Sequence, residues 1–125
     1  MKVKEVMNKA IAVDHDISLK QAAKIMSDKN IGSLIVVKGD NIIGIVTESD
    51  LLRNFSNPHK NVSAVMNKHV VTVDQEEDID HAALLMAKHK IRRLPVAKGP
   101  KLLGIITSTD IIAHAEEIGD EFFFD

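Results

Sequence analysis

The sequence predicts an α/β fold built from two similar repeats, each ordered strand, helix, strand, strand, helix. Three observations lead to this prediction. The sequence repeats itself at a spacing of 60 residues, as between Thr47 and Thr107. Each repeat holds an apolar stripe with helical spacing. Each stripe is followed by two short apolar runs joined by a glycine-containing turn, which is typical of a β-hairpin.

The repeat is clearest in a seven-residue motif. Residues 44–50 read Gly-Ile-Val-Thr-Glu-Ser-Asp, and residues 104–110 read Gly-Ile-Ile-Thr-Ser-Thr-Asp. The chain therefore divides into repeat 1 at residues 1–61 and repeat 2 at residues 62–125. Two repeats are too few for a solenoid, so we expect a pseudo-twofold pair packed through the sheets, with a ligand-sized cleft between the repeats.

The first long helix of each repeat has a start signal and an apolar face. Ser18 and Gln21 fit a capping box, in which each side chain bonds the backbone amide of the other. Apolar residues follow at i, i+3, i+4 and i+7, namely Leu19, Ala22, Ala23 and Met26. In repeat 2 we expect Asp78 to cap a helix with the stripe Ile79, Ala82, Ala83 and Met86.

The remaining elements follow in the same order in both repeats. The predicted hairpins join residues 34–37 to 42–47 and residues 94–97 to 102–107. Their nearly continuous apolar runs indicate strands covered on both faces. Second helices are expected from residue 48 to about 55 and from 108 to about 118, short extra strands at 11–13 and 70–73, and helical turns at 3–7 and 62–66.

Composition excludes several classes of protein. The chain has no cysteine, a net charge of −2 and no apolar run near the roughly 20 residues that span a bilayer. Its N-terminus has no apolar segment typical of a signal peptide. We therefore expect a cytoplasmic protein with no membrane or nucleic-acid partner. No nucleophile–base pair or paired carboxylates indicate catalysis, so we do not expect an enzyme.

The Thr-x-x-Asp pattern at Thr47 and Asp50, repeated at Thr107 and Asp110, has two interpretations. One is a capping box at a helix start. The other is a ligand site, because backbone amides at a helix start suit an anion and a threonine hydroxyl can donate to phosphate. An aspartate carboxylate can also accept two hydrogen bonds from a vicinal diol such as ribose. The two interpretations are compatible.

The chain resembles a tandem pair of cystathionine-β-synthase (CBS) domains, called a Bateman module, from about Val3 to about Ala115. The resemblance is carried by ordered motifs: Val-Met-Asn at 6–8 and 65–67, Ala-Ala-x-x-Met at 22–26 and 82–86, Ile-Arg-Arg-Leu-Pro-Val at 91–96, and the two Gly-Ile-aliphatic-Thr-x-x-Asp motifs. It implies regulatory binding of an adenosine-containing ligand, such as AMP, ADP, ATP or S-adenosylmethionine, with no catalytic cofactor.

The resemblance also implies two ligand sites, each drawing on both repeats, with phosphate and ribose held by the Thr-x-x-Asp residues. The main nucleotide site is expected to comprise Thr47, Ser49, Asp50, Val70, Val71, Arg92 and Arg93. The second, weaker site is expected to comprise Ile11, Ala12, Ser33, Thr107, Thr109 and Asp110. The two sites are expected to differ in ligand affinity because Arg92 and Arg93 in repeat 2 align with Gly32 and Ser33 in repeat 1. Arginine guanidinium groups bind phosphate through two hydrogen bonds.

Two function hypotheses follow. The first is an AMP- or ATP-type energy-sensing module that acts on a protein partner in trans and, by resemblance, pairs into a homodimer. The alternative is a ligand-free interaction scaffold in which the threonines and aspartates only cap helices. The six histidines show no metal-ligand spacing, so we assign no metal. The tail Phe122-Phe123-Phe124 either packs on its own chain or docks on another subunit.

Overall fold

A computed structural model describes residues 1–114, and these divide into two compact units. The first unit comprises residues 11–70. The second unit joins residues 1–10 to the chain from residue 71 onward. The compact units are therefore offset from the sequence repeats: the segment that opens each repeat belongs to the unit holding most of the other repeat.

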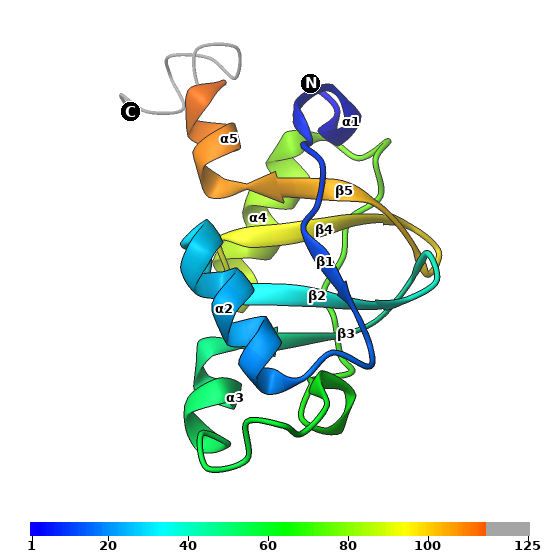
Figure 1. Cartoon of the computed structure of the whole chain (residues 1–125). Coiled ribbons are helices and arrows are strands. Elements are labelled where there is room, and N and C mark those ends of the chain that lie inside the picture. The colour runs from blue at the N-terminus through cyan, green and yellow to red at the C-terminus, as the bar shows by residue number, and fades with distance from the viewer. Residues whose placement is uncertain (115–125) are drawn as a thin grey trace. The chain divides into compact units, whose positions relative to one another are not determined.

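The first unit has a three-stranded sheet with helices beside it (Figure 1). Strand β1 runs parallel to β2, and β2 pairs antiparallel with β3. The elements in chain order are β1 (Ala12–Asp14), α2 (Leu19–Lys29), β2 (Ser33–Lys38), β3 (Asn41–Thr47), α3 (Glu48–Arg53) and the 3-10 helix η1 (Val62–Ala64).

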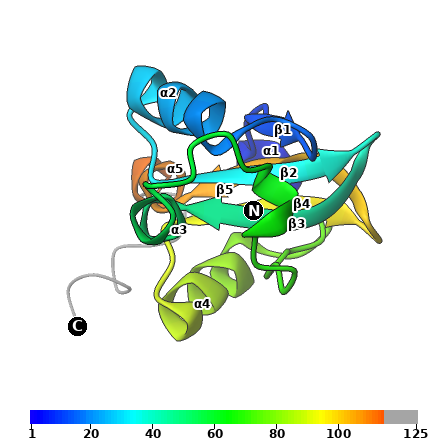
Figure 2. The same ribbon diagram turned by 60° about the horizontal axis from the view of Figure 1, so that its bottom comes forward.

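The second unit repeats this plan around one antiparallel hairpin. Helix α4 lies along the β4–β5 hairpin (Figure 2). Its elements are α1 (Val3–Val6), α4 (Ile79–His89), β4 (Arg93–Lys98), β5 (Lys101–Thr107) and α5 (Ser108–Ala113). In place of a counterpart to β1, an isolated parallel bridge joins Val73 to Val96. The predicted α/β class is confirmed, whereas the predicted strand at 70–73 shortens to this bridge.

The local signals had mixed outcomes. The capping box of Ser18 and Gln21 is present, with the Gln21 amide 3.1 Å from the serine hydroxyl. Asp78 occupies the N-cap position of α4, as predicted. Its side chain makes no capping hydrogen bond, so the predicted side-chain cap was wrong. Helix α3 ends at Arg53, earlier than predicted. Helix α5 spans Ser108–Ala113, and the part of its predicted range beyond residue 114 lies outside the described residues.

Each unit has its own core, and each core takes side chains from an opening segment. In the first unit, Val62 is fully buried against the α2 stripe and strands β2 and β3. In the second unit, Val3 and Val6 are buried against α4, β4 and β5. Burying one valine contributes roughly 1.5–3 kcal/mol, so these contacts fix each opening segment in its unit.

Glycines allow the opening segments to approach the hairpins closely. The backbone of Asn8 pairs with Ile105 through bonds of 2.8 and 2.9 Å, and Asn67 pairs with Ile45 in the same way. A side chain at Gly104 would place its Cβ 2.7 Å from the carbonyl oxygen of Asn8, which is too close for any real contact. Glycine is therefore required at this position because the opening segment passes so close to it.

Two predictions from the sequence concern the C-terminal tail and membrane-spanning segments. The phenylalanines at 122–124 lie outside the described residues, so neither interpretation of the tail is tested. Within residues 1–114, every helix is too short or too polar to cross a membrane.

Candidate functional site

The first Thr-x-x-Asp motif forms a complete capping box at the junction of β3 and α3. The amide and hydroxyl of Thr47 donate to Oδ2 of Asp50 over 2.9 and 3.0 Å, and the Asp50 amide returns a bond to the Thr47 hydroxyl. The other carboxylate oxygen, Oδ1, accepts from Nη2 of Arg53, one turn along the helix. The Asp50 side chain is only 12% exposed, and the Arg53 guanidinium compensates its negative charge.

The second motif repeats these bonds at the junction of β5 and α5. The amide and hydroxyl of Thr107 each donate to Oδ2 of Asp110 over 2.8 Å. The partner of the remaining oxygen differs, because the Asn8 side-chain amide donates to both Oδ1 and Oδ2 at 2.9 Å. Position 113, which matches Arg53 in the repeat, is an alanine.

Two of the first three backbone amides of α3 and of α5 have partners. In α3 the Glu48 amide donates to the Gly32 carbonyl, and in α5 the Ser108 amide donates to the Arg92 carbonyl. The amides of both aspartates donate to the threonine hydroxyls. Among the described residues, two of the first three amides of each helix therefore have partners, which leaves those of Ser49 and Thr109. The expectation of an anion site at each helix start stays a prediction that depends on these two amides and on nearby side chains.

The hairpin register places further predicted residues beside each threonine. Ser33 opens β2 directly opposite Thr47, and Arg93 opens β4 directly opposite Thr107. Directly opposed residues in an antiparallel pair lie on the same face of the sheet, with Cβ atoms about 5 Å apart. Within one unit, the structure thus brings Arg93 to the Thr107 box, whereas the sequence analysis grouped it with Asp50. That grouping joins the two units and stays a prediction.

The other predicted residues lie near the same ends of their sheets. Ile11 is 38% exposed and directly precedes β1, in which Ala12 pairs with Ile35. Ser49 and Thr109 stand in the first turns of α3 and α5 and are exposed. The rest follow this pattern: Arg92 is exposed before β4, Val71 packs against the second core, and Val70 ends the first unit half-buried.

Sequence reasoning missed two residues that contact the aspartates. Arg53 follows Asp50 at i+3 on a helix, a spacing at which side chains meet, so its ion pair was open to prediction. Asn8 belongs to the repeated Val-Met-Asn motif, but its partner lies 102 residues away. Its repeat counterpart Asn67 accepts a bond from the His69 amide instead, so the motif alone does not give the role.

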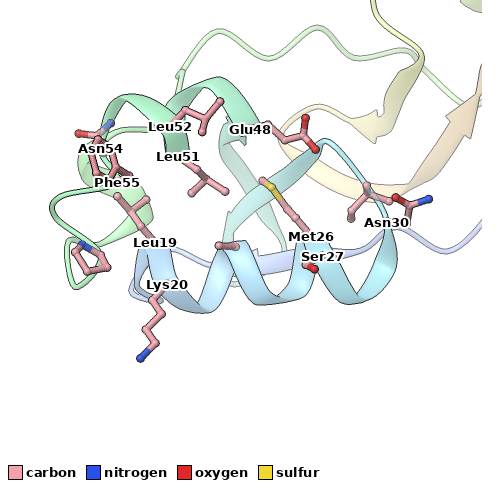
Figure 3. Close-up of a pocket in the computed structure, with 13 residues that line it drawn as sticks. Leu19, Lys20, Met26, Ser27, Asn30, Glu48, Leu51, Leu52, Asn54 and Phe55 are labelled. Carbon is pink, nitrogen blue, oxygen red and sulfur yellow. The ribbon is translucent and has the colours of Figure 1, made fainter.

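A separate pocket of about 660 Å³ lies in the first unit between α2 and α3 (Figure 3). Leu19 and Met26 from α2 and Leu51 from α3 point into it, and Glu48 and Asn30 lie at one end. Leu52 and Phe55 on its lining are 73% and 81% exposed. Thr47 and Asp50 do not line this pocket, so it is distinct from the capping-box site.

One charged cluster has a perturbed pKa. Glu76 accepts from the ammonium groups of Lys2 and Lys4, each at 2.9 Å. The hydrogen bonds from Lys4 and Lys2 lower the pKa of Glu76 to about 2, and the bond to Glu76 raises the pKa of Lys2. The cluster is exposed and joins α1 to the segment before α4, so it serves the second unit rather than a site.

Fold and site together define a tandem-repeat α/β protein with one Thr-x-x-Asp box in each repeat. The model of the CBS domain matches this chain twice, at residues 3–57 and 62–117. The chain therefore belongs to the CBS domain family, as the repeated motifs predicted.

Solved structures support the same conclusion. The CBS domain pair of protein MJ0100, in complex with 5′-methylthioadenosine and S-adenosyl-L-methionine, is 30% identical with a TM-score of 0.78, covering 95% of this chain and 98% of that one. CBSX2 in complex with AMP is 25% identical with a TM-score of 0.82, covering 94% and 97%.

A relative among curated sequences belongs to a longer protein. L-aspartate semialdehyde sulfurtransferase from Methanocaldococcus jannaschii is 34% identical over 112 residues, which cover 87% of this chain and 22% of the relative. The chain spans about a third or less of the length of the first three curated relatives that it matches.

Proposed function

We propose that this chain is a regulatory module that binds an adenosine-containing ligand through its two Thr-x-x-Asp boxes and acts on a protein partner in trans. One observation carries the proposal: each box holds an aspartate carboxylate through hydrogen bonds at the end of a strand in a CBS pair, with Arg53 on Asp50 and Arg93 opposite Thr107. A fixed carboxylate can accept from a ribose diol, and the arginines offer partners for phosphate. Solved CBS pairs with S-adenosyl-L-methionine and with AMP support the ligand class.

The two boxes offer different cations. At Asp110, Arg93 stands opposite Thr107 and could bind a phosphate tail while the carboxylate holds the ribose. At Asp50, Arg53 is bound to the carboxylate itself, with its own side chain 68% exposed. A phosphate there would share Arg53 with Asp50. AMP, ADP, ATP and S-adenosylmethionine all remain candidates under this proposal, and energy sensing depends on which one binds.

The alternative is a ligand-free scaffold, and one observation favours it. Both boxes are already satisfied, since every oxygen of Asp50 and Asp110 accepts a hydrogen bond within the protein. Helix capping alone would account for the threonines and aspartates. Under this alternative, replacing either aspartate lowers stability, and no adenosine-containing ligand stabilises the parent protein.

We also propose that two copies pair through their helices. Large apolar side chains stand exposed on α3 and α4, as Leu52 and Leu84 are 73% and 68% exposed, and Phe55 beside α3 is 81% exposed. Large apolar side chains exposed on helices are typical of an interaction surface. The variant Leu52→Asp should shift the mass measured by light scattering from two chains to one, whereas Lys24→Ala, at an exposed lysine that pairs with Asp28 within α2, should not.

The experiment that tests the function is a thermal-shift panel with AMP, ADP, ATP, S-adenosylmethionine and NAD, followed by calorimetry of each ligand that stabilises the protein. A ligand at 100 times its dissociation constant adds about 2.7 kcal/mol to stability, which gives a large shift. We expect Asp50→Ala and Asp110→Ala each to remove one binding event. No stabilisation by any ligand would contradict the proposal and favour the scaffold.

A double-mutant cycle tests which aspartate shares a ligand with Arg93. Coupling between Arg93→Ala and Asp110→Ala, measured with ATP, is expected if the hairpin register defines the site. Coupling with Asp50→Ala instead would support the grouping drawn from the sequence. Lys101→Ala provides the control, because Lys101 pairs with Lys98 at the end of the hairpin far from Arg93 and Thr107.

A further inference from the structure

The Asn8 side chain holds an unusual position on the carboxylate of Asp110. Its Nδ2 atom lies 2.9 Å from Oδ1 and 2.9 Å from Oδ2. Equal distances to both oxygens place the nitrogen midway between them. A bidentate donor, such as a guanidinium or a pair of vicinal hydroxyls, would bind the same two oxygens.

We infer that Asn8 is an internal occupant of the ribose position at Asp110, so that a ligand's diol must displace the asparagine amide to bind there. The inference rests on the proposed function, because it assumes that the aspartate is a diol acceptor. It makes Asn8 a residue that sets the specificity and relative affinity of one site.

The remaining hydrogen-bonding capacity of Asp110 supports this. Oδ2 already accepts from the amide and hydroxyl of Thr107 in addition to Asn8. Oδ1 accepts from Asn8 alone among the described residues. A carboxylate oxygen has two lone pairs, so Thr107 alone fills Oδ2 and the ribose hydroxyls must bind at Oδ1, where the Asn8 amide stands.

Among residues 1–114, no side chain contacts both oxygens of Asp50. Arg53 donates to Oδ1 only, and Oδ2 accepts from Thr47. The asparagine at the matching position, Asn67, has the same backbone bonds to its hairpin as Asn8, at 2.8 and 2.9 Å to Ile45. Its side chain accepts from the His69 amide and leaves the aspartate alone. The chain thus contains a matched pair of asparagines, of which only one occupies a carboxylate.

Displacement of Asn8 requires only a side-chain rotation. Its backbone is fixed by two bonds to Ile105 and passes over Gly104, and neither contact involves the side chain. Asn8 is an exposed residue, so its released amide can be solvated. Removing the side chain should therefore leave the second unit folded and Asp110 accessible.

The test compares adenosine, which carries a diol and no phosphate, with 2′-deoxyadenosine, which lacks the diol. Calorimetry is performed on Asp50→Ala, in which only the Asp110 site remains, with and without Asn8→Ala. Where Asn8 occupies the site in most molecules, the apparent affinity for adenosine is reduced by the fraction of molecules in which the site is open. Since a hydrogen bond to a charged group contributes more than an ordinary one, we expect Asn8→Ala to tighten adenosine binding about tenfold. Binding of 2′-deoxyadenosine should not change.

Controls separate this inference from the proposed function. Asn67→Ala in the same background should leave adenosine affinity unchanged, and Asp50→Ala with Asp110→Ala should abolish binding. Unchanged or weaker adenosine binding in Asn8→Ala, with binding still dependent on Asp110, would overturn the inference and keep the function. Absence of adenosine binding in every variant would overturn both. If Asp50→Ala does not fold, Asp50→Asn supplies the background.

Discussion

The two Thr-x-x-Asp boxes have the same sequence pattern, the same helix junction and the same threonine bonds, but their carboxylates are held differently. Asp50 is paired with a cation on its own helix, Arg53, whereas Asp110 is held by a neutral amide from Asn8, 102 residues away in the sequence. The comparison shows that duplicated motifs keep their local geometry while their surroundings diverge. Differences in ligand preference between the two sites should therefore arise from Arg53, Asn8 and Arg93, and not from the motif.

The largest expected effect concerns the glycines beneath the opening segments. At Gly104 an added Cβ meets the Asn8 backbone oxygen at 2.7 Å, whereas at Gly44 the first obstacle is the flexible end of Met66, with the Asn67 oxygen at 3.1 Å. A side chain can move aside more easily than a backbone. We expect Gly104→Ala to reduce the free energy of unfolding by about 2–3 kcal/mol and Gly44→Ala by about 1 kcal/mol, measured by urea denaturation.

Equal costs for the two glycine variants would show that both opening segments yield to the same extent. A greater cost for Gly44→Ala would contradict the account of how the Asn8 segment is positioned. Because Gly104→Ala also displaces Asn8, it should expose the carboxylate of Asp110 to ligand wherever the variant remains folded.

A smaller effect is expected from removing the cation at Asp50. Arg53→Met keeps the side-chain stem but leaves a carboxylate that is only 12% exposed without its ion pair. We expect a loss of about 1 kcal/mol, because the arginine is solvent-exposed and the pair is partly screened. The loss should shrink at high salt.

The comparison with Asn8→Ala sharpens this prediction. Replacing a neutral amide donor should change stability by a similar or smaller amount, and that change should depend little on salt. Urea denaturation at low and high ionic strength measures both. Equal salt dependence in the two variants would argue against the ion pair as the difference between the boxes.

The smallest expected effect concerns the exposed cluster around Glu76. Its pKa is lowered to about 2 by Lys4 and Lys2, so the bonds contribute stability above the unfolded value near 4.5 and lose it as the pH falls through about 2. Glu76→Gln should therefore lower the melting temperature slightly at pH 7, with a difference that vanishes between pH 4.5 and 2. A difference that persists at pH 2 would rule out the charged form as its source.

The repeated hairpins, the capping boxes and three residues of the α2 stripe were predictable because each depends on neighbours along one helix or one strand pair; the fourth stripe residue, Ala23, is exposed. The box of Ser18 and Gln21 and those at Thr47 and Thr107 are of this kind. The placement of the opening segments was not predictable in this way. Val3 and Val6 lie in a core formed by residues after 71, and a short apolar segment does not indicate which of two similar hairpins it will join.

The site was predictable in its residues but not in its contacts. Thr47, Asp50, Thr107 and Asp110 followed from the repeated motif, whereas Asn8 required the fold, because no local pattern links it to Asp110. The helix-start amides illustrate the opposite case. Sequence alone suggested that all of them were available to an anion, yet the carbonyls of Gly32 and Arg92 accept from the first amide of α3 and of α5.

The most direct test of the account is calorimetric titration of adenosine into the parent protein, Asp50→Ala and Asp110→Ala. We expect two binding events in the parent, of which the tighter is lost in Asp50→Ala, because Arg53 contacts one oxygen of that carboxylate whereas Asn8 contacts both oxygens of Asp110. Asp110→Ala should retain the tighter event and lose the weaker one. Loss of the tighter event in Asp110→Ala, or two unchanged events in both variants, would contradict the account.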